Sequence, residues 1–318
     1  MGSYNASDIG SYITRDDLLI SRMVNNRVAY RMVMKEAVNM VTTDRLSERL
    51  LFQKHSSKYI LPMLNKEAGG VETQTIEYFG TDFQLSKWSN GVEATFEASL
   101  QMDRDKQIMQ AVNACGDGFA RFNDVEILGS LIDGAGITTT ASAEWDSSSA
   151  DIPTDINAML TAVLQQEDCD ITDTDLQGML LYYPSKLMPV FNDPIKTTTS
   201  TATSMGVTKQ QMETDGMWAQ TAYGCRLRPR KDLNYVGKAI AVIPSPETAD
   251  HITLQSPMLP EVAHIVDQEH QVEKWVNHRY FGTFIYPSSE DSSGKSYKVM
   301  LINDVCDPVA YPAIATIS

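Results

Sequence analysis

The sequence predicts an α+β fold, and three patterns support this class. Apolar residues recur at helical spacing over 103–134 and again over 153–165, while segments of strand composition dominate the last third of the chain. A further segment, 67–102, alternates with a period of two. The chain of 318 residues is long enough for one large domain or two moderate ones.

Residues 1–66 are expected to form an amphipathic N-terminal arm. Over 16–41 apolar residues share one helical face and arginines fill the other, and a shorter helix is expected over 44–54. Because the apolar face runs along most of the arm, we expect it to dock on a body or on a neighbouring molecule.

Residues 67–102 are predicted to form an extended β-hairpin. Its second strand, 94–102, alternates apolar and polar residues, and 71–79 is rich in the Val, Thr, Ile, Tyr and Phe typical of strands. The residues between them, 80–91, form an unusually long predicted loop. An isolated hairpin has too little core to be stable in water, so it must lie on something else. We expect this to be another copy of the chain.

The predicted loop carries Phe83, Leu85 and Trp88 among polar residues. Exposed apolar side chains gathered in one place indicate a contact surface. Together with Lys87 they are the residues expected to contact a neighbouring subunit. The alternative is a loop that folds back on its own domain.

A long helix is predicted directly after the hairpin. Asp103 and Asp105 suit a helix N-terminus, and Gly134 suits a C-terminus. Gly116 and Gly118 lie in its middle, where they predict either a kink or a close approach of another element.

The rest of the chain is expected to contain mainly strands. Pro153 starts a second helix, a buried strand covers 176–183, a short helical turn covers 185–191 and a loop covers 196–208. Strands are then expected around 223–227 and 237–243, split by a basic turn of Arg226, Arg228, Arg230 and Lys231. The C-terminal part, 262–286 and 297–303, is expected to be rich in strands, with a plain hairpin loop at 287–295.

The charge is unevenly distributed. Residues 1–66 carry ten Lys and Arg against six Asp and Glu, a net charge of +4, whereas 67–318 carries −19, for a total of −15. A basic segment on an acidic body suits contact with a polyanion such as nucleic acid. The alternative is that these arginines only form the solvated face of a helix.

No signature of catalysis or of a cofactor is present. Phosphate-binding glycine motifs, the GxSxG motif and the HExxH motif are all absent. His264, His270 and His278 are too widely spaced along one predicted strand to converge on a metal. Cys225 beside Arg226 has no nearby histidine to activate it. We therefore expect no catalytic residue, cofactor or metal, and no apolar stretch is long enough to predict a membrane span.

The order of elements resembles the HK97-like major capsid proteins of tailed phages and related archaeal viruses. The stretches 222–229 (AYGCRLRP) and 237–243 (GKAIAVI) resemble the turn and strands of that family's axial domain. The resemblance implies an N-terminal arm at 1–66, an extended hairpin called the E-loop at 67–102, and a first peripheral part with a spine helix at 103–175. It further implies an axial domain at 176–260 and peripheral strands at 261–318.

The resemblance also implies a structural function without enzymatic activity. Copies of the chain would form hexamers and pentamers of an icosahedral shell around double-stranded DNA, as a virion capsid assembled in the host cytoplasm. Scaffolding, portal and cement proteins are the further partners implied, with no membrane. The residues that would face the genome are Arg15, Arg22, Arg27, Arg31, Arg45 and Arg49.

Some relatives crosslink a hairpin lysine to an asparagine of a neighbour. Lys87 and Asn90 lie in the predicted loop, but no catalytic carboxylate can be assigned to them. Three other functions stay open: an encapsulin-type compartment around cargo enzymes, another virion component such as a tail-tube subunit, and a soluble α+β enzyme with an unrecognised site.

Overall fold

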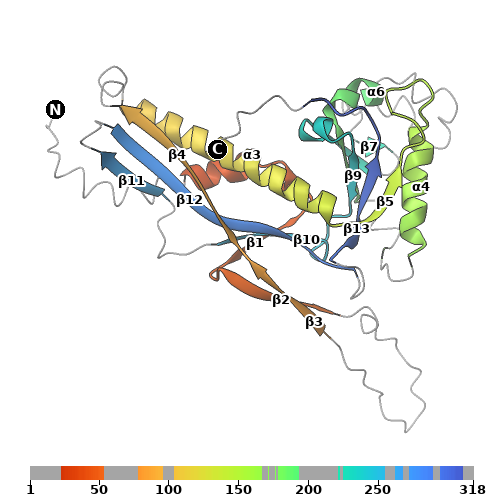
Figure 1. The fold of residues 1–318 in the computed structure, drawn as a ribbon, viewed down its shortest axis with the longest axis horizontal. Coiled ribbons are helices and arrows are strands. Elements are labelled where there is room, and N and C mark those ends of the chain that lie inside the picture. Colours follow the sequence, from red (N-terminus) through yellow and green to blue (C-terminus); the bar gives the residue numbers. More distant parts are fainter. Residues whose placement is uncertain are drawn as a thin grey trace, which may run out of the picture.

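The computed structural model describes residues 23–53, 78–95, 104–166, 171, 176, 178–192, 221–222, 225–254, 262–267, 272–288 and 294–310. These residues form two main sheets and a two-stranded ribbon, with one long helix running between the sheets (Figure 1). The α+β class is confirmed.

The long sheet is organised around β12 (Val272–Ile285). Strand β4 (Ser86–Thr95) pairs antiparallel along one edge of β12. Strands β10 (Ala249–Leu254) and β11 (Val262–Asp267) pair antiparallel along its other edge, one after the other. Strand β1 (Asn39–Thr43) adds to β10 in parallel.

The six-stranded sheet lies at the other end of the molecule (Figure 1). In spatial order its strands are β5 (Ala135–Thr140), β13 (Ser296–Asn303), β9 (Ala239–Val242), β6 (Leu180–Pro184), β8 (Cys225–Arg230) and β7 (Thr221–Ala222). Strands β6, β9 and β13 are apolar throughout their central residues, since both faces of this sheet are covered.

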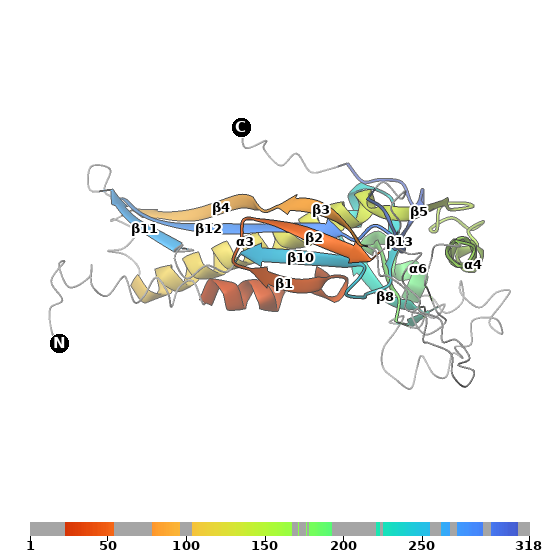
Figure 2. The same ribbon diagram turned by 90° about the horizontal axis from the view of Figure 1, so that it is seen from below.

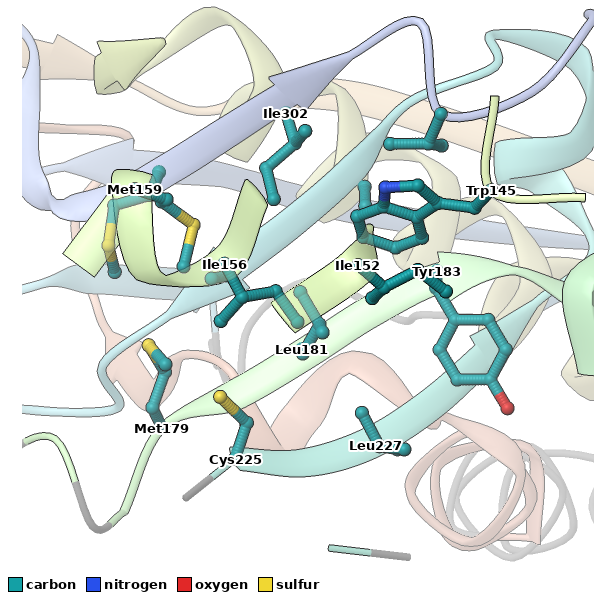
Figure 3. Packing of buried hydrophobic residues seen from close by; sticks show 14 of the residues in the cluster. Trp145, Ile152, Ile156, Met159, Met179, Leu181, Tyr183, Cys225, Leu227 and Ile302 are labelled. Carbon is teal, nitrogen blue, oxygen red and sulfur yellow. The ribbon is translucent and has the colours of Figure 1, made fainter. Parts of the chain in front are cut away.

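One face of the six-stranded sheet packs against α4 (Ile152–Leu164) and α6 (Met188–Asn192). Figure 3 shows this core, in which Ile156 and Met159 of α4 lie over Leu181 of β6. Asp151 caps α4, because its carboxylate accepts a hydrogen bond from the Thr154 backbone N–H at 3.2 Å. The helix predicted at Pro153 is confirmed.

The opposite face of the same sheet packs against α3 (Arg104–Asp133). Ile127 and Leu131 of α3 are fully buried there with Tyr182 and Ile240 of the sheet. Further towards its N-terminus, α3 buries Phe119 against Phe281 of the long sheet. One helix therefore belongs to two hydrophobic cores.

The long helix of the sequence prediction is confirmed as α3, followed by Gly134. It is helical without interruption, and Gly116 marks a close approach. A Cβ atom at this position would come within 2.7 Å of Arg27 Cγ, so the glycine lets the helix at 23–31 pack directly on α3.

The N-terminal arm differs from its prediction. Residues 23–31 are helical, but the segment continues into a short 3-10 helix, η1 (Met34–Glu36), and then into β1 and β2 (Ser47–Gln53). The helix expected over 44–54 is therefore wrong. Leu46, Leu50 and Leu51 fit helical spacing, but pairing with another strand decides the conformation.

The hairpin prediction is displaced along the chain. The predicted loop at 80–91 is wrong, because β3 (Tyr78–Gln84) and β4 cover nearly all of it. Strand β3 pairs antiparallel with β2, and β4 pairs with β12. The observed ribbon is therefore β2–β3. Of the strand predicted over 94–102, the first two residues belong to β4, and 96–102 lies outside the described residues.

Two further details differ. Arg226, Arg228 and Arg230 lie within β8 and not in a turn. The connection at 287–295 is not a hairpin loop, since β12 and β13 belong to different sheets. The expected segment 261–318 is thus divided between the two sheets, and α4, expected in the peripheral part, packs on the six-stranded sheet. The domain limits stay a prediction.

Two acidic residues of α3 form hydrogen bonds with neighbouring elements of the fold. The buried Asp124 accepts hydrogen bonds from the backbone N–H groups of Val33 (3.0 Å) and Met34 (2.8 Å), with Arg230 at 3.4 Å. Burial raises its pKa, against the lowering effect of these donors. Glu126 accepts hydrogen bonds from the backbone N–H and the hydroxyl of Thr283 on β12.

Replacing Asp124 with Asn should lower the free energy of unfolding by about 2–4 kcal/mol, because Arg230 would lose a buried partner and an amide donor would face other donors. Urea denaturation of the unassembled subunit measures this. Asp133→Asn, at the exposed end of the same helix, is the control and should change stability by less than about 0.5 kcal/mol. Equal effects of the two substitutions would contradict the role of Asp124 in holding η1 and Arg230.

Glu126 predicts a loss of stability in acid. Burial raises its pKa, but hydrogen bonds from His251 and Thr283 outweigh burial and hold the pKa below its ordinary value of 4.5. Its contribution is therefore complete above pH 4.5 and is lost as the pH falls through the folded-state pKa. Unfolding free energy measured against pH should fall more steeply below that point for the wild type than for Glu126→Gln. Parallel curves would disprove this role.

Candidate assembly surfaces

The β2–β3 ribbon projects from the long sheet (Figure 1). Among the described residues these two strands pair only with each other. Leu51 is 63% exposed and Tyr78 is 58% exposed, and they lie towards the end of the ribbon that is farther from β4. A two-stranded ribbon with exposed apolar side chains is marginal in water, so it has the properties of a contact arm.

The root of the ribbon is fixed to its own subunit. The Leu85 backbone N–H donates to the Leu46 carbonyl at 2.9 Å, which closes the junction between β3 and β4. The Phe83 ring lies edge-on to Phe284, with centroids 5.5 Å apart. It also lies over Gly282, where a Cβ atom would come within 2.8 Å of the ring.

Two of the four residues predicted to contact a neighbouring subunit therefore pack within their own chain. Leu85 is only 6% exposed, and Phe83 packs on β12. Their expected position in an exposed loop is wrong, because β3 and β4 form one extended run that brings both side chains against the body. The alternative of a segment folded back on its own domain describes these two residues.

Lys87 and Trp88 retain exposed surface. Lys87 lies on the solvent side of β4, with its ammonium 5.8 Å from the centre of the Tyr280 ring. Trp88 is 37% exposed and contacts Phe122 of α3, with ring centroids 4.6 Å apart. Phe122 is itself 38% exposed, so an aromatic patch lies where β4 meets α3. Contact of Lys87 and Trp88 with a neighbour stays a prediction.

Four of the six arginines predicted to face a genome lie in the described residues, and these four are not grouped together. Arg27 forms a two-pronged ion pair with Asp117 of α3, at 2.6 and 2.9 Å, and Arg31 lies 3.4 Å from the same carboxylate. Arg27 thereby holds the pKa of Asp117 below its usual value. Arg45 and Arg49 lie instead near and on the ribbon. Arg15 and Arg22 lie outside the described residues.

The candidate thiol and the histidines show no reactive geometry in the described part. Burial raises the pKa of Cys225 to about 12, opposite to the shift that a catalytic thiolate needs. His264 lies on β11 and His278 on β12, where its Nδ1 is 2.6 Å from Ser89 Oγ. His270 lies outside the described residues, and within them no three potential ligands gather around a metal position. None of the described helices is both long and apolar enough to cross a bilayer.

Comparison with known proteins supports the fold through structure alone. No family model and no curated protein matches the sequence. A virus-like particle protein from Pyrococcus furiosus matches with a TM-score of 0.52 and 9% identity, over 89% of this chain and 96% of that one. The mature capsid of bacteriophage PhiM1 matches with a TM-score of 0.56 and 7% identity, over 86% of each chain.

A third similar structure is the holo-SrpI encapsulin complex from Synechococcus elongatus, with a TM-score of 0.53, 11% identity, and coverage of 86% of this chain and 88% of that one. The matches extend over nearly the whole length of both chains. The chain therefore has the HK97-like capsid fold, as the order of its elements predicted.

Substitution of Leu85 separates a root residue from a contact residue. Leu85→Ala should lower the unfolding free energy of the unassembled subunit by about 2–4 kcal/mol, because it opens a cavity beneath the ribbon. Leu51→Ala, the matched control at an exposed position, should cost less than about 0.5 kcal/mol. Chemical denaturation measures both. A stable Leu85→Ala subunit would show that this side chain acts elsewhere.

Proposed function

We propose that the chain is the structural subunit of an icosahedral shell that encloses double-stranded DNA. The observation that carries this proposal is the β2–β3 ribbon, which is held firmly at its root but has no sheet neighbour among the described residues. The fold of the chain, which is similar to the folds of capsid and encapsulin subunits, supports a shell-forming role.

Contact between subunits follows from the exposure of the ribbon. Burying the side chains of Leu51 and Tyr78 on a neighbour contributes about 1.5–3 kcal/mol each before the losses of association. A ribbon reaching from one subunit onto the next makes a heterologous contact, and such contacts close into rings when the rotation permits. Hexamers and pentamers of this kind, arranged as a shell, are the proposed assembly.

The remaining parts of the proposal concern partners and location. Scaffolding, portal and cement proteins are proposed partners, and the proposed location is the virion capsid, assembled in the host cytoplasm. Lys87 and Trp88 are proposed to extend the contact made by the ribbon, since both have surface available.

The second candidate function is an encapsulin-type compartment, favoured by the similarity to the encapsulin complex from Synechococcus elongatus. Sequencing and mass spectrometry of the contents of purified particles separate the two. Packaged DNA supports the virion, whereas a single copurified enzyme supports the compartment. A stable monomer near 35.3 kDa that never assembles would favour a soluble enzyme over both.

Charged substitutions on the ribbon test the assembly. The double variant Leu51→Glu/Tyr78→Glu should remain folded but lose particle formation, because two carboxylates would be desolvated in the contact. Negative-stain microscopy and sedimentation measure particles, and circular dichroism measures folding. Leu51→Met/Tyr78→Phe is the control and should assemble normally. Particles formed in normal yield by the charged variant would rule out the ribbon as the contact arm.

A further inference from the structure

Strand β8 carries arginines on one of its faces. Cys225 and Leu227 point into the core beneath α4, so the residues that alternate with them, Arg226, Arg228 and Arg230, occupy the opposite face. Their exposure changes steadily along the strand. Arg230 is buried, Arg228 is half-buried and Arg226 is exposed.

The N-terminal segment meets this face of β8. Arg228 donates two hydrogen bonds to Glu36 of η1, at 3.0 and 2.9 Å. Arg230 contacts Asp124, which holds the backbone of η1 at Met34. In Figure 2 the helix at 23–31 and β8 both lie on the lower side of the molecule. Basic residues from distant parts of the sequence thus share one surface.

Cations outnumber the carboxylates that pair with them on this surface, which we call the basic strip. Its seven cations are Arg27, Arg31, Lys35, Arg226, Arg228, Arg230 and Lys231, and its four paired carboxylates are Glu36, Asp117, Asp124 and Asp232. The excess of three charges corresponds to three exposed side chains. Within the described residues, Lys35, Arg226 and Lys231 take part in no ion pair.

The basic strip is unusual in a chain of net charge −15. The acidic remainder repels polyanions, but at about 0.1 M salt the Debye length is about 10 Å, so charges farther away are largely screened. Nearby cations then determine most of the electrostatic potential at a bound phosphate. Exposed lysine and arginine side chains without carboxylate partners are the groups that contact phosphates in sequence-independent nucleic-acid binding.

We infer that the basic strip binds the phosphate backbone of double-stranded DNA through Lys35, Arg226 and Lys231. The inference rests on the proposed function, in which DNA lies inside the shell, and it places the DNA-facing surface where the N-terminal segment meets β8. Arg27 and Arg31 contribute less, because Asp117 already pairs with both.

The test compares two triple variants with the same change in charge. Lys35→Gln/Arg226→Gln/Lys231→Gln removes the exposed cations of the basic strip. Arg45→Gln/Lys274→Gln/Lys295→Gln removes cations elsewhere and is the control. Lys274 is half-buried and the other five side chains are exposed, so both variants should fold. Binding to a fluorescent DNA duplex of random sequence is measured by anisotropy over a range of salt concentrations.

The basic-strip variant should bind DNA at least about tenfold more weakly at low salt, and the slope of log K against log salt should become less negative by about 3. The control variant should retain most of the wild-type affinity and most of the wild-type salt dependence. Equal losses in the two variants would overturn the inference, since net charge alone would then govern binding. Tighter binding of poly-glutamate than of the duplex would also overturn it, in favour of an acidic protein partner.

Measuring particle formation and DNA content separately distinguishes a failure of this inference from a failure of the proposed function. Normal particles of the basic-strip variant, with less DNA per particle by the ratio of absorbance at 260 and 280 nm, support the inference. Normal particles with unchanged DNA content contradict it and leave the shell intact. A wild-type chain that forms no particles contradicts the proposed function itself, whereas the binding comparison on free subunits still tests the basic strip.

Discussion

The position of α3 is the constraint on which the rest of the structure depends. This single helix contributes Phe119 to the core beneath the long sheet and Leu131 to the core of the six-stranded sheet. Since both cores are close-packed, the helix cannot shift in one without disturbing the other. Asp124 and Glu126, two residues apart, point to different neighbours and reinforce this position with hydrogen bonds.

The ribbon depends on this body for its direction. Phe83 packs on Phe284 of β12, and β4 pairs with β12, which itself packs on α3. The β2–β3 ribbon beyond this root has little hydrophobic core of its own. Its direction is nevertheless fixed, because β3 continues into β4, which is paired with the long sheet. A contact arm of this kind reaches a neighbour in a defined direction, which reduces the conformational entropy lost on assembly.

Periodicity allowed the helices and most strands to be predicted. Helix α3 agrees closely with its predicted bounds, because nine apolar residues at helical spacing and a terminal glycine leave little alternative. The predictions failed at 44–54 and 80–91, where short apolar runs fit more than one conformation. Only pairing of β2 with β3, and of β4 with β12, assigned both segments to strands. No local signal in either segment marks its partner.

The sequence by itself determined the α+β class, the long helix, the uneven charge and the order of elements that resembles the HK97-like fold. All of these follow from local spacing and composition. Tertiary structure alone decided that Leu85 is buried, that Arg27 is neutralised by Asp117, and that Arg228 pairs with Glu36. The reason is physical: burial and ion pairing depend on residues that are distant in sequence, and only folding sets their distances.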